Sequence, residues 1–310
     1  MPSLGRLSLT VCPLDATQYS RDPSSGPVVN RIADEQKRRN EQSRGMWDRF
    51  GPHRDRVTRL LVDSATAGGR LCVLGAGNCN DVDLGALLDE FREIHLVDLD
   101  TDALRSGVSR QGYEDSARVF LHGDVDVTCI ADRLGSWTPE HPPESRELDA
   151  CLELAATHPP LDLAGPFDTV CSACLLTQLL DSIVMALGQR HPRCLELALR
   201  VRAQHLRLLV ELLRPGGTGV LVMEIVSSAT FPDLPKIPES RLVETATRLI
   251  NERNFFTGMN PLVIHASFHS DPQLAPWVET AEITSPWLWD LGPRVYLVCA
   301  VVVRRKLGES

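Results

Sequence analysis

The fold is decided by a short stretch, residues 70–81, which reads RLCVLGAGNCND. Its first residues, Arg70–Leu74, form an apolar run typical of a buried strand. Gly75-Ala76-Gly77 follows at once, and Leu84, Leu87, Leu88 and Phe91 then fall at helical spacing. Glycines at a strand-to-helix turn let the backbone approach a ligand closely, and the first N–H groups of the helix are free to bind it. The stretch predicts the first strand and ligand loop of an α/β fold, although a tight turn without a ligand is the alternative.

Strands and helices alternate downstream of this stretch. Apolar runs predict further strands at Glu93–Asp100, Arg118–Asp124, Phe167–Cys174 and Thr218–Ser228, and a closing pair at Trp277–Trp289 and Val295–Arg304. A Leu-rich helix over Arg193–Leu213 ends at Pro215-Gly216-Gly217. This alternation predicts a mostly parallel sheet with helices on both faces. The proline-rich residues 133–166 interrupt it as an insertion around a helix at Ser145–Ala156.

The region before the sheet divides into two parts. Residues 1–27 hold four prolines without periodicity and predict an extended arm. Residues 28–66 predict a helical cap, which Asn30 begins and which Gly51 and Pro52 break into two helices. The main domain is expected over residues 67–310.

Composition narrows the class of protein. The chain has 310 residues, of which 43% are hydrophobic and 24% are charged, and its formal net charge is -9. An acidic total disfavours a nucleic-acid substrate, because phosphate backbones attract basic surfaces. The nine cysteines have no framework spacing, and the N-terminus lacks a signal-peptide pattern. We therefore expect a cytoplasmic protein without a membrane span.

Two acids at strand ends discriminate between cofactor classes. Asp98 lies 21 residues beyond Gly77, where a carboxylate can accept hydrogen bonds from both hydroxyls of a ribose. Asp100 is better placed to cap the next helix. A dinucleotide loop places its third glycine where this chain has Asn80, whose side chain would crowd a pyrophosphate. Asp124, at the end of the third strand, can accept a hydrogen bond from an adenine amino group. A dehydrogenase does not usually need an acid at this position.

These features resemble the class I S-adenosylmethionine (SAM)-dependent methyltransferases over roughly residues 70–304. The resemblance rests on the Leu74–Gly77 turn, Asp98, Gly123-Asp124 and the segment Leu213–Gly217. It implies a Rossmann-like seven-stranded sheet, mostly parallel, with the last strand antiparallel beside the fifth. It also implies SAM as cofactor and S-adenosylhomocysteine (SAH) as product.

The resemblance implies the roles of individual residues. The glycine turn would pass under the methionine portion of SAM, Asp98 would hold the ribose, Leu99 would lie against the adenine, and the fourth-strand end would border the methyl group. The expected cofactor site comprises Gly75, Ala76, Gly77, Asn78, Asp81, Asp98, Leu99, Asp124, Val125, Cys171, Ser172 and Ala173. The chain departs from the family pattern at Val73, where many members have an acid that contacts the methionine amino group. Asn78, Asp81 or the N-terminal helices are the candidates to replace that acid.

Other motifs are weaker. Cys171 and Cys174 form a single CxxC, and His265 and His269 are four residues apart without a third ligand at clear spacing, so we expect no metal. Trp287 and Trp289 share one face of a strand, where they could line an aromatic pocket, although packing is the commoner reason.

The acceptor is expected to be a small molecule. The base-methylating signature of an acid or Asn, two prolines and an aromatic residue is absent at the fourth strand, where Cys171–Leu176 stands. Residues 28–62 and the region after the fifth strand are expected to enclose the acceptor, with Arg44, Trp47 and Phe50 as the lid residues. A SAM-binding protein without catalysis and an NAD(P)-dependent oxidoreductase remain the alternatives.

Overall fold

The computed structural model describes residues 30–157, 161 and 163–308, and the expected arm at residues 1–27 lies outside them. One sheet carries eight strands in the order β3-β2-β1-β4-β5-β8-β6, and β7 also pairs with β8. The first five strands are parallel, and β8 runs antiparallel to β5. The strands are β1 Gly69–Leu74, β2 Phe91–Val97, β3 Val119–His122, β4 Phe167–Ala173, β5 Leu213–Ser227, β6 Val278–Ile283, β7 Trp287–Asp290 and β8 Val295–Arg305. The expected Rossmann-like, mostly parallel sheet with an antiparallel last strand beside the fifth is confirmed.

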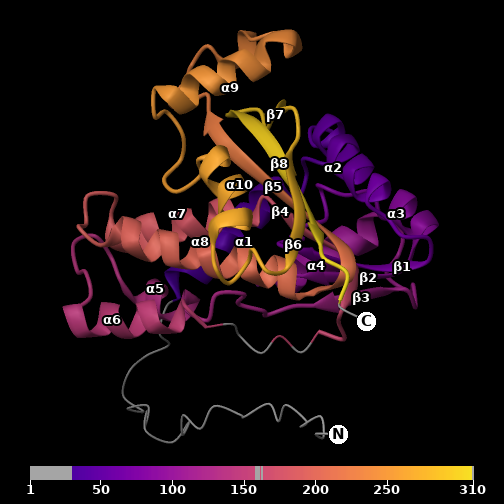
Figure 1. The fold of residues 1–310 in the computed structure, drawn as a ribbon, viewed down its shortest axis with the longest axis horizontal. Coiled ribbons are helices and arrows are strands. Elements are labelled where there is room, and N and C mark those ends of the chain that lie inside the picture. The colour runs from indigo at the N-terminus through magenta and orange to yellow at the C-terminus, as the bar shows by residue number, and fades with distance from the viewer. Residues whose placement is uncertain (1–29, 158–160, 162, 309–310) are drawn as a thin grey trace, which may run out of the picture.

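Helices cover both faces of this sheet (Figure 1). The helices are α1 Arg31–Ser43, α2 Gly51–Asp63, α3 Leu84–Glu90, α4 Thr101–Arg110, α5 Ala131–Ser136, α6 Ser145–Leu154, α7 Leu175–Leu187, α8 Cys194–Glu211, α9 Leu242–Asn251 and α10 Pro261–Ser270, with short 3₁₀ turns at Leu234–Lys236 and Glu239–Arg241. Side chains of α2, α3 and α4 pack on one face, and side chains of α5 to α10 pack on the other. The side chains of β1 point alternately to these two faces. Leu71 and Val73 pack in the core beside α2, α3 and α4, and Cys72 and Leu74 pack in the core beside α5 to α10.

Local sequence signals account for several helix ends. Asn30 caps α1, because its side chain accepts a hydrogen bond from the backbone N–H of Ala33. Pro52 lies in the first turn of α2, where it loses no helical hydrogen bond. Asp100 caps α4 by accepting from the N–H groups of Asp102 and Ala103, as expected. These caps fix where helices begin around the carboxyl ends of the strands.

Two expected boundaries differ from the structure. The helix expected over Arg193–Leu213 ends at Glu211, and β5 already includes Pro215-Gly216-Gly217. Residues 214–217 bulge out of the pairing with β4, since Leu213 pairs with Phe167 and Thr218 pairs with Thr169, and Gly216 has a φ of 76°. The strand expected over Trp277–Trp289 divides into β6 and β7, which both pair with β8. The sheet therefore has one strand more than the seven expected.

The two N-terminal helices have different places in the fold. Phe50, Val57 and Leu61 of the α2 region are buried in the core beside α3 and the sheet. Burial of one such side chain is worth about 1.5–3 kcal/mol, so α2 is part of the folded body. Of the two helices expected to form the cap, only α1 lies over the carboxyl ends of the strands. In the described part of the chain, no helix combines the length and apolar character that a membrane crossing requires.

Candidate active site

The turn after β1 is shaped by its two glycines. Gly75 and Gly77 have φ of 74° and 45°, in the left-handed region that favours glycine. A Cβ on Gly75 would lie 2.7 Å from the Cβ of Leu175 at the start of α7. The N–H groups of Gly75 and Ala76 donate to the carbonyl of Val97 at 2.9 and 3.1 Å, which ties the turn to the end of β2.

This tie brings Asp98 against the glycine turn. One carboxylate oxygen of Asp98 accepts from the N–H of Gly77 at 2.8 Å, and the other accepts from the N–H of Asp100 at 2.9 Å. Burial is the largest influence on Asp98 and raises its pKa to about 6, although these hydrogen bonds act to lower it. Asp98 is thus a fixed carboxylate at the carboxyl edge of the parallel strands, where this kind of fold binds its ligands.

A cleft opens beside Asp98, which we call the first cleft. It encloses about 770 Å³ of space, part of it open to solvent. Its wall is mostly apolar and carries a few polar groups, as is typical of a small-molecule site. It is lined by Ile32, Gln36, Asn40, Gly75, Gly77, Val97, Asp98, Leu99, Val125, Asp126, Val127, Thr128, Ile130, Ala131, Leu134, Leu175, Gln178, Leu179, Ser182 and Val201.

Five of the sequence-predicted residues meet in the first cleft: Gly75, Gly77, Asp98, Leu99 and Val125. Asp124 follows β3 as expected but does not line it. Its side chain is exposed and accepts from the hydroxyl of Thr101 at 2.8 Å. The next acid, Asp126, lines the cleft but uses both oxygens locally, on Thr128 and on the N–H of Ala131.

The other predicted residues pack around the cleft without lining it. Asn78 is buried and donates to the carbonyl of Asn40, so it holds the loop against α1. Cys171, Ser172 and Ala173 are also buried, and the Ser172 hydroxyl lies 2.8 Å from Nε2 of His205. A central strand covered on both faces leaves these side chains no open side. The following residues Leu175, Gln178 and Leu179 of α7 line the cleft in their place.

The sequence pointed to the N-terminal helices as a whole, and the individual residues with which α1 lines the first cleft were missed. Ile32, Gln36 and Asn40 recur at four-residue spacing and line the first cleft together. The amide of Asn40 donates to Asp100 at 3.1 Å, and its oxygen lies 2.9 Å from where a Cβ on Gly77 would be. The spacing was visible in the sequence, but the position of α1 over the loop depends on contacts between distant segments.

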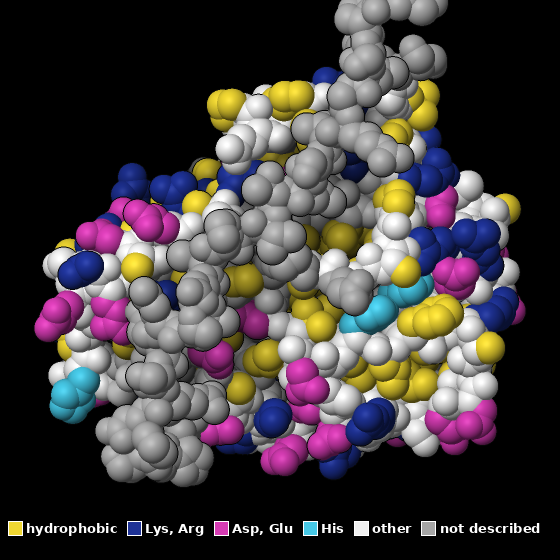
Figure 2. Space-filling view, turned by 90° about the horizontal axis from the view of Figure 1, so that it is seen from below, with side chains coloured by type: hydrophobic (Ala, Val, Ile, Leu, Met, Phe, Trp, Pro, Cys, Tyr) yellow, Lys and Arg dark blue, Asp and Glu magenta, His cyan; other side chains and the backbone are white. Residues whose placement is uncertain are grey.

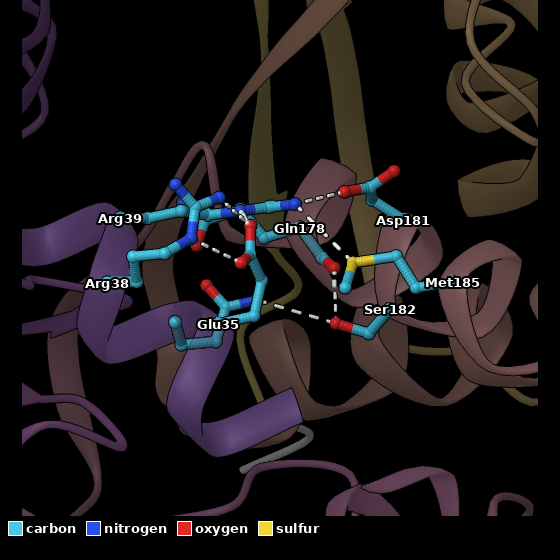
Figure 3. A network of polar contacts seen from close by, with 8 residues as sticks. Glu35, Arg38, Arg39, Gln178, Asp181, Ser182 and Met185 are labelled. Carbon is cyan, nitrogen blue, oxygen red and sulfur yellow. Dashed lines mark hydrogen bonds and ion pairs between the residues drawn. The ribbon is translucent and has the colours of Figure 1, made fainter. Parts of the chain in front are cut away.

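A polar network fastens α1 to α7 (Figure 3). Arg39 donates to Asp181 at 2.5 Å and to Glu35 at 2.9 Å, and its guanidinium lies 3.6 Å from the sulfur of Met185. Gln36 donates to the hydroxyl of Ser182 at 3.4 Å. Hydrogen bonds from Arg38, and then from Arg39, lower the pKa of Glu35 to about 2. The network therefore holds α1 across the mouth of the first cleft.

None of the three expected lid residues lines the first cleft. Phe50 is buried, and its ring centroid lies 5.0 Å from that of Trp289. Trp47 stacks under the guanidinium of Arg54, which is 3.4 Å from the ring centroid. Arg44 is exposed and lines neither this cleft nor the second one described next.

The second cleft is larger and adjoins the first, because Asn40 and Gln178 line both. It encloses about 2060 Å³, including open solvent. It is lined by Glu35, Arg38, Arg39, Asn40, Gln42, Ser43, Met46, Thr177, Gln178, Leu180, Asp181, Val184, Gln189, Glu224, Thr230, Phe255, Phe256, Thr257, Met259, Trp289, Leu291, Pro293, Arg294 and Tyr296. Both tryptophans of β7 are buried, and Trp289 also forms part of this wall.

A buried cluster beside the clefts resembles a metal site in composition. Single ligand atoms of His53, Asp81 and Cys174 lie within 4.8 Å of one another. The indole N–H of Trp287 donates to Nδ1 of His53 at 3.1 Å, and Nε2 of His53 is 3.0 Å from Asp81. An indole can only donate, so Nδ1 must accept and the proton of the neutral ring lies on Nε2. In this arrangement His53 offers no lone pair to a metal ion.

Glu224 was also missed by sequence reasoning. It stands alone among the apolar residues of Val220–Val226 in β5, and a lone acid in a buried strand is a signal that could have found it.

The thiol pKa of Cys174, which neighbours Glu224, is raised by burial, which favours the neutral thiol. The CxxC is therefore a pair of buried thiols in the structure.

Comparisons with known proteins give distant likenesses. No family model and no curated protein matches the sequence. Among solved structures, the chain is similar to a putative SAM-dependent methyltransferase from Methanococcus maripaludis, with 11% identity, 92% of this chain and 97% of that chain covered, and a TM-score of 0.44. It is similar to an O-methyltransferase family protein from Burkholderia thailandensis, with 14% identity, coverage of 90% and 63%, and a TM-score of 0.44. It is also similar to an rRNA methylase from Streptococcus thermophilus, with 11% identity, coverage of 80% and 93%, and a TM-score of 0.38.

These likenesses are too distant to assign an activity or an acceptor. The topology of the chain itself is more informative, because β8 inserts antiparallel between β5 and β6 at the end of a parallel 3-2-1-4-5 sheet. The chain thus has the Rossmann-like fold of the class I SAM-dependent methyltransferases.

Proposed function

We propose that the first cleft binds SAM and that the protein transfers the methyl group of SAM to a small molecule in the second cleft. One observation carries this proposal: the glycine turn, Asp98 and an apolar wall meet in a single cleft at the carboxyl ends of the parallel strands.

The residues of the first cleft fit the parts of SAM. Asp98 would accept hydrogen bonds from the ribose hydroxyls while it continues to hold Gly77. Leu99 and Val125 would lie against the adenine, together with Ile130 of the same apolar wall. Asp124 would reach the adenine amino group by releasing Thr101.

The methionine portion would lie between the glycine turn and α1. Val73 offers no acid there, and neither Asn78 nor Asp81 lines the cleft. The amides of Gln36 and Asn40 are the polar groups that α1 supplies to this wall, so we assign them to the amino-acid end of the cofactor. This assignment selects the N-terminal helix among the three candidates from the sequence.

Catalysis in this arrangement depends mainly on alignment. The sulfonium of SAM supplies an activated methyl group, which is transferred by in-line displacement. Gln178 and Asn40 border both clefts and would orient the acceptor toward the cofactor. Positioning of this kind is worth about 7–11 kcal/mol in the best cases. The network around Arg39 holds α1 over the cofactor and would help to exclude water.

A small acceptor fits the charge distribution better than a polyanion. Figure 2 shows acidic and basic side chains interspersed over the described part of one face, without a continuous basic surface. The chain as a whole carries a formal charge of -9. A nucleic-acid substrate would instead favour a basic stripe.

The proposal can be tested with methyl-tritiated SAM. The protein is incubated with a cell extract separated into small molecules, protein and RNA, and the label is measured in each fraction. We expect label in the small-molecule fraction only. Label in RNA or in a large folded protein contradicts the enclosed acceptor, and binding of SAM without transfer in any fraction indicates a non-catalytic SAM-binding protein.

A further inference from the structure

The deepest charged group of the second cleft is Glu224. Its side chain points to the sheet face that also carries Val220 and Val222, and the residue is 7% exposed. The hydroxyl of Thr177 donates to one of its carboxylate oxygens at 2.6 Å. Thr177 lines the second cleft, and the next residue, Gln178, lines both clefts.

Aromatic side chains line the second cleft together with this carboxylate. The ring centroids of Trp289 and Tyr296 are 5.6 Å apart, and those of Tyr296 and Phe256 are 6.3 Å apart. The N–H of Phe256 donates to the carbonyl of Ile225, next to Glu224 in β5, at 2.9 Å. This bond ties the backbone of Phe256 to the strand that carries the acid. Faces of aromatic rings attract ammonium groups within about 6 Å.

Among the described residues Glu224 has no ion pair, and Arg294, the remaining cation of the second cleft, lies beside Tyr296. Glu35 and Asp181 are paired with Arg38 and Arg39 in the network of Figure 3. The polar side chains recorded at Glu224 are Thr177 and the Cys174 thiol, and neither is charged in this setting. A buried carboxylate next to aromatic rings is a complementary site for an amine that enters with its own positive charge.

We propose that the methyl acceptor is an amine and that Glu224 binds its ammonium group and takes its proton. This inference rests on the proposed function. The ammonium gives one proton to the Glu224 carboxylate and becomes a neutral amine. The nitrogen lone pair then forms a bond to the methyl carbon as the bond from that carbon to sulfur breaks, which leaves SAH and a methylated ammonium. Glu224 returns the proton to solvent when the product leaves.

The surroundings of Glu224 suit this role. Burial is the largest influence and raises its pKa to about 7, Thr177 and Cys174 act against that change, and the nearby charge of Asp81 adds to it. Tyr296 faces Glu224 from β8, and its own pKa is raised chiefly by burial. A carboxylate of this kind exchanges protons near neutral pH, where a general base works best.

The binding test uses 2-phenylethylamine and its neutral counterpart 2-phenylethanol. Calorimetry is run on the full chain, with and without SAH. We expect the wild type to prefer the amine by about tenfold or more, the worth of a hydrogen bond to a charged group. Glu224→Gln should abolish the preference, and Glu224→Asp should retain part of it. Glu244→Gln, at an exposed site paired with Arg241, is the matched control and should retain all of it.

Equal binding of the two probes by the wild type, or no binding of either, overturns the inference. So does equal loss in the Gln and Asp variants, because that indicates a purely structural role. Run without SAH, the same titrations decide the amine preference even if the protein fails to bind SAH, which would contradict the proposed function instead.

The transfer test measures tritium moved from SAM to the amine. Glu224→Gln should lower kcat/KM by about 10²–10⁴-fold, the usual contribution of a general base, while SAH affinity stays unchanged. Transfer to phenols and alcohols but not to amines overturns the inference and leaves the methyltransferase proposal standing.

Discussion

Replacement of Asp98 tests the cofactor site most sharply, since the structure separates its role from that of Asp100. Asp98 is the carboxylate that lines the first cleft, whereas Asp100 is buried and caps α4. Hydrogen bonds to a charged group are worth about 1.5–3 kcal/mol, so Asp98→Ala should weaken SAH binding by about 10- to 150-fold. Asp100→Ala should lower the free energy of unfolding by about 0.5–2 kcal/mol through loss of the cap. It should weaken SAH binding less than Asp98→Ala does, because Asp100 reaches the cofactor site only through its hydrogen bond from Asn40.

Isothermal titration calorimetry with SAH and thermal unfolding of both variants distinguish the two roles. Because Asp98 also accepts from the N–H of Gly77, Asp98→Asn serves as the variant that keeps an acceptor for the loop. It should bind SAH more weakly than the wild type but more tightly than the alanine variant. An equal loss of affinity in the Asp98 and Asp100 variants, or a larger loss for Asp100, would falsify the assignment of Asp98.

Three further perturbations test separate parts of the site. Gly77→Ala should lower SAH affinity at least tenfold, because the residue has φ of 45° and α1 covers its Cβ direction, while Gly112→Ala, with φ of 77° and open space, should leave the affinity unchanged, as calorimetry can measure. SAH affinity should be full above about pH 7 and fall as the pH drops through about 6. Ribose hydroxyls donate hydrogen bonds to the ionised Asp98, and its raised pKa of about 6 makes the ionised form scarce below that pH. An SAH affinity that stays constant from pH 5 to 8 contradicts this reasoning. Arg39→Met should speed SAH release in stopped-flow measurements by freeing α1 from Asp181, and an unchanged release rate would show that this ion pair does not hold the cover.

The sequence predicts those parts of the fold that depend on local patterns. Local signals predicted the glycine turn after β1, the acid after β2 and the caps at Asn30 and Asp100. Each of these signals lies within a few residues of the helix or strand that it begins or ends. The parallel sheet followed from the alternation of strands and helices, and the antiparallel last strand beside β5 agrees with what the resemblance implied.

The lining of the clefts depends on contacts between distant segments, and the sequence alone did not locate it. Cys171 and Ser172 are at the expected strand end, but they face covered sides of the sheet. Gln36 and Asn40 reach the cleft only because α1 is fastened to α7. A charged pattern on α1 shows a polar helix surface, and it does not show which part of that surface another helix will meet.

The most direct test of the cofactor assignment is a parallel calorimetric titration of the full chain with SAM, SAH and NAD. The cleft beside Asp98 predicts saturable micromolar binding of SAM and SAH, and Asn80 in place of a third glycine predicts no binding of NAD. Saturable binding of NAD with no response to SAH would contradict the account.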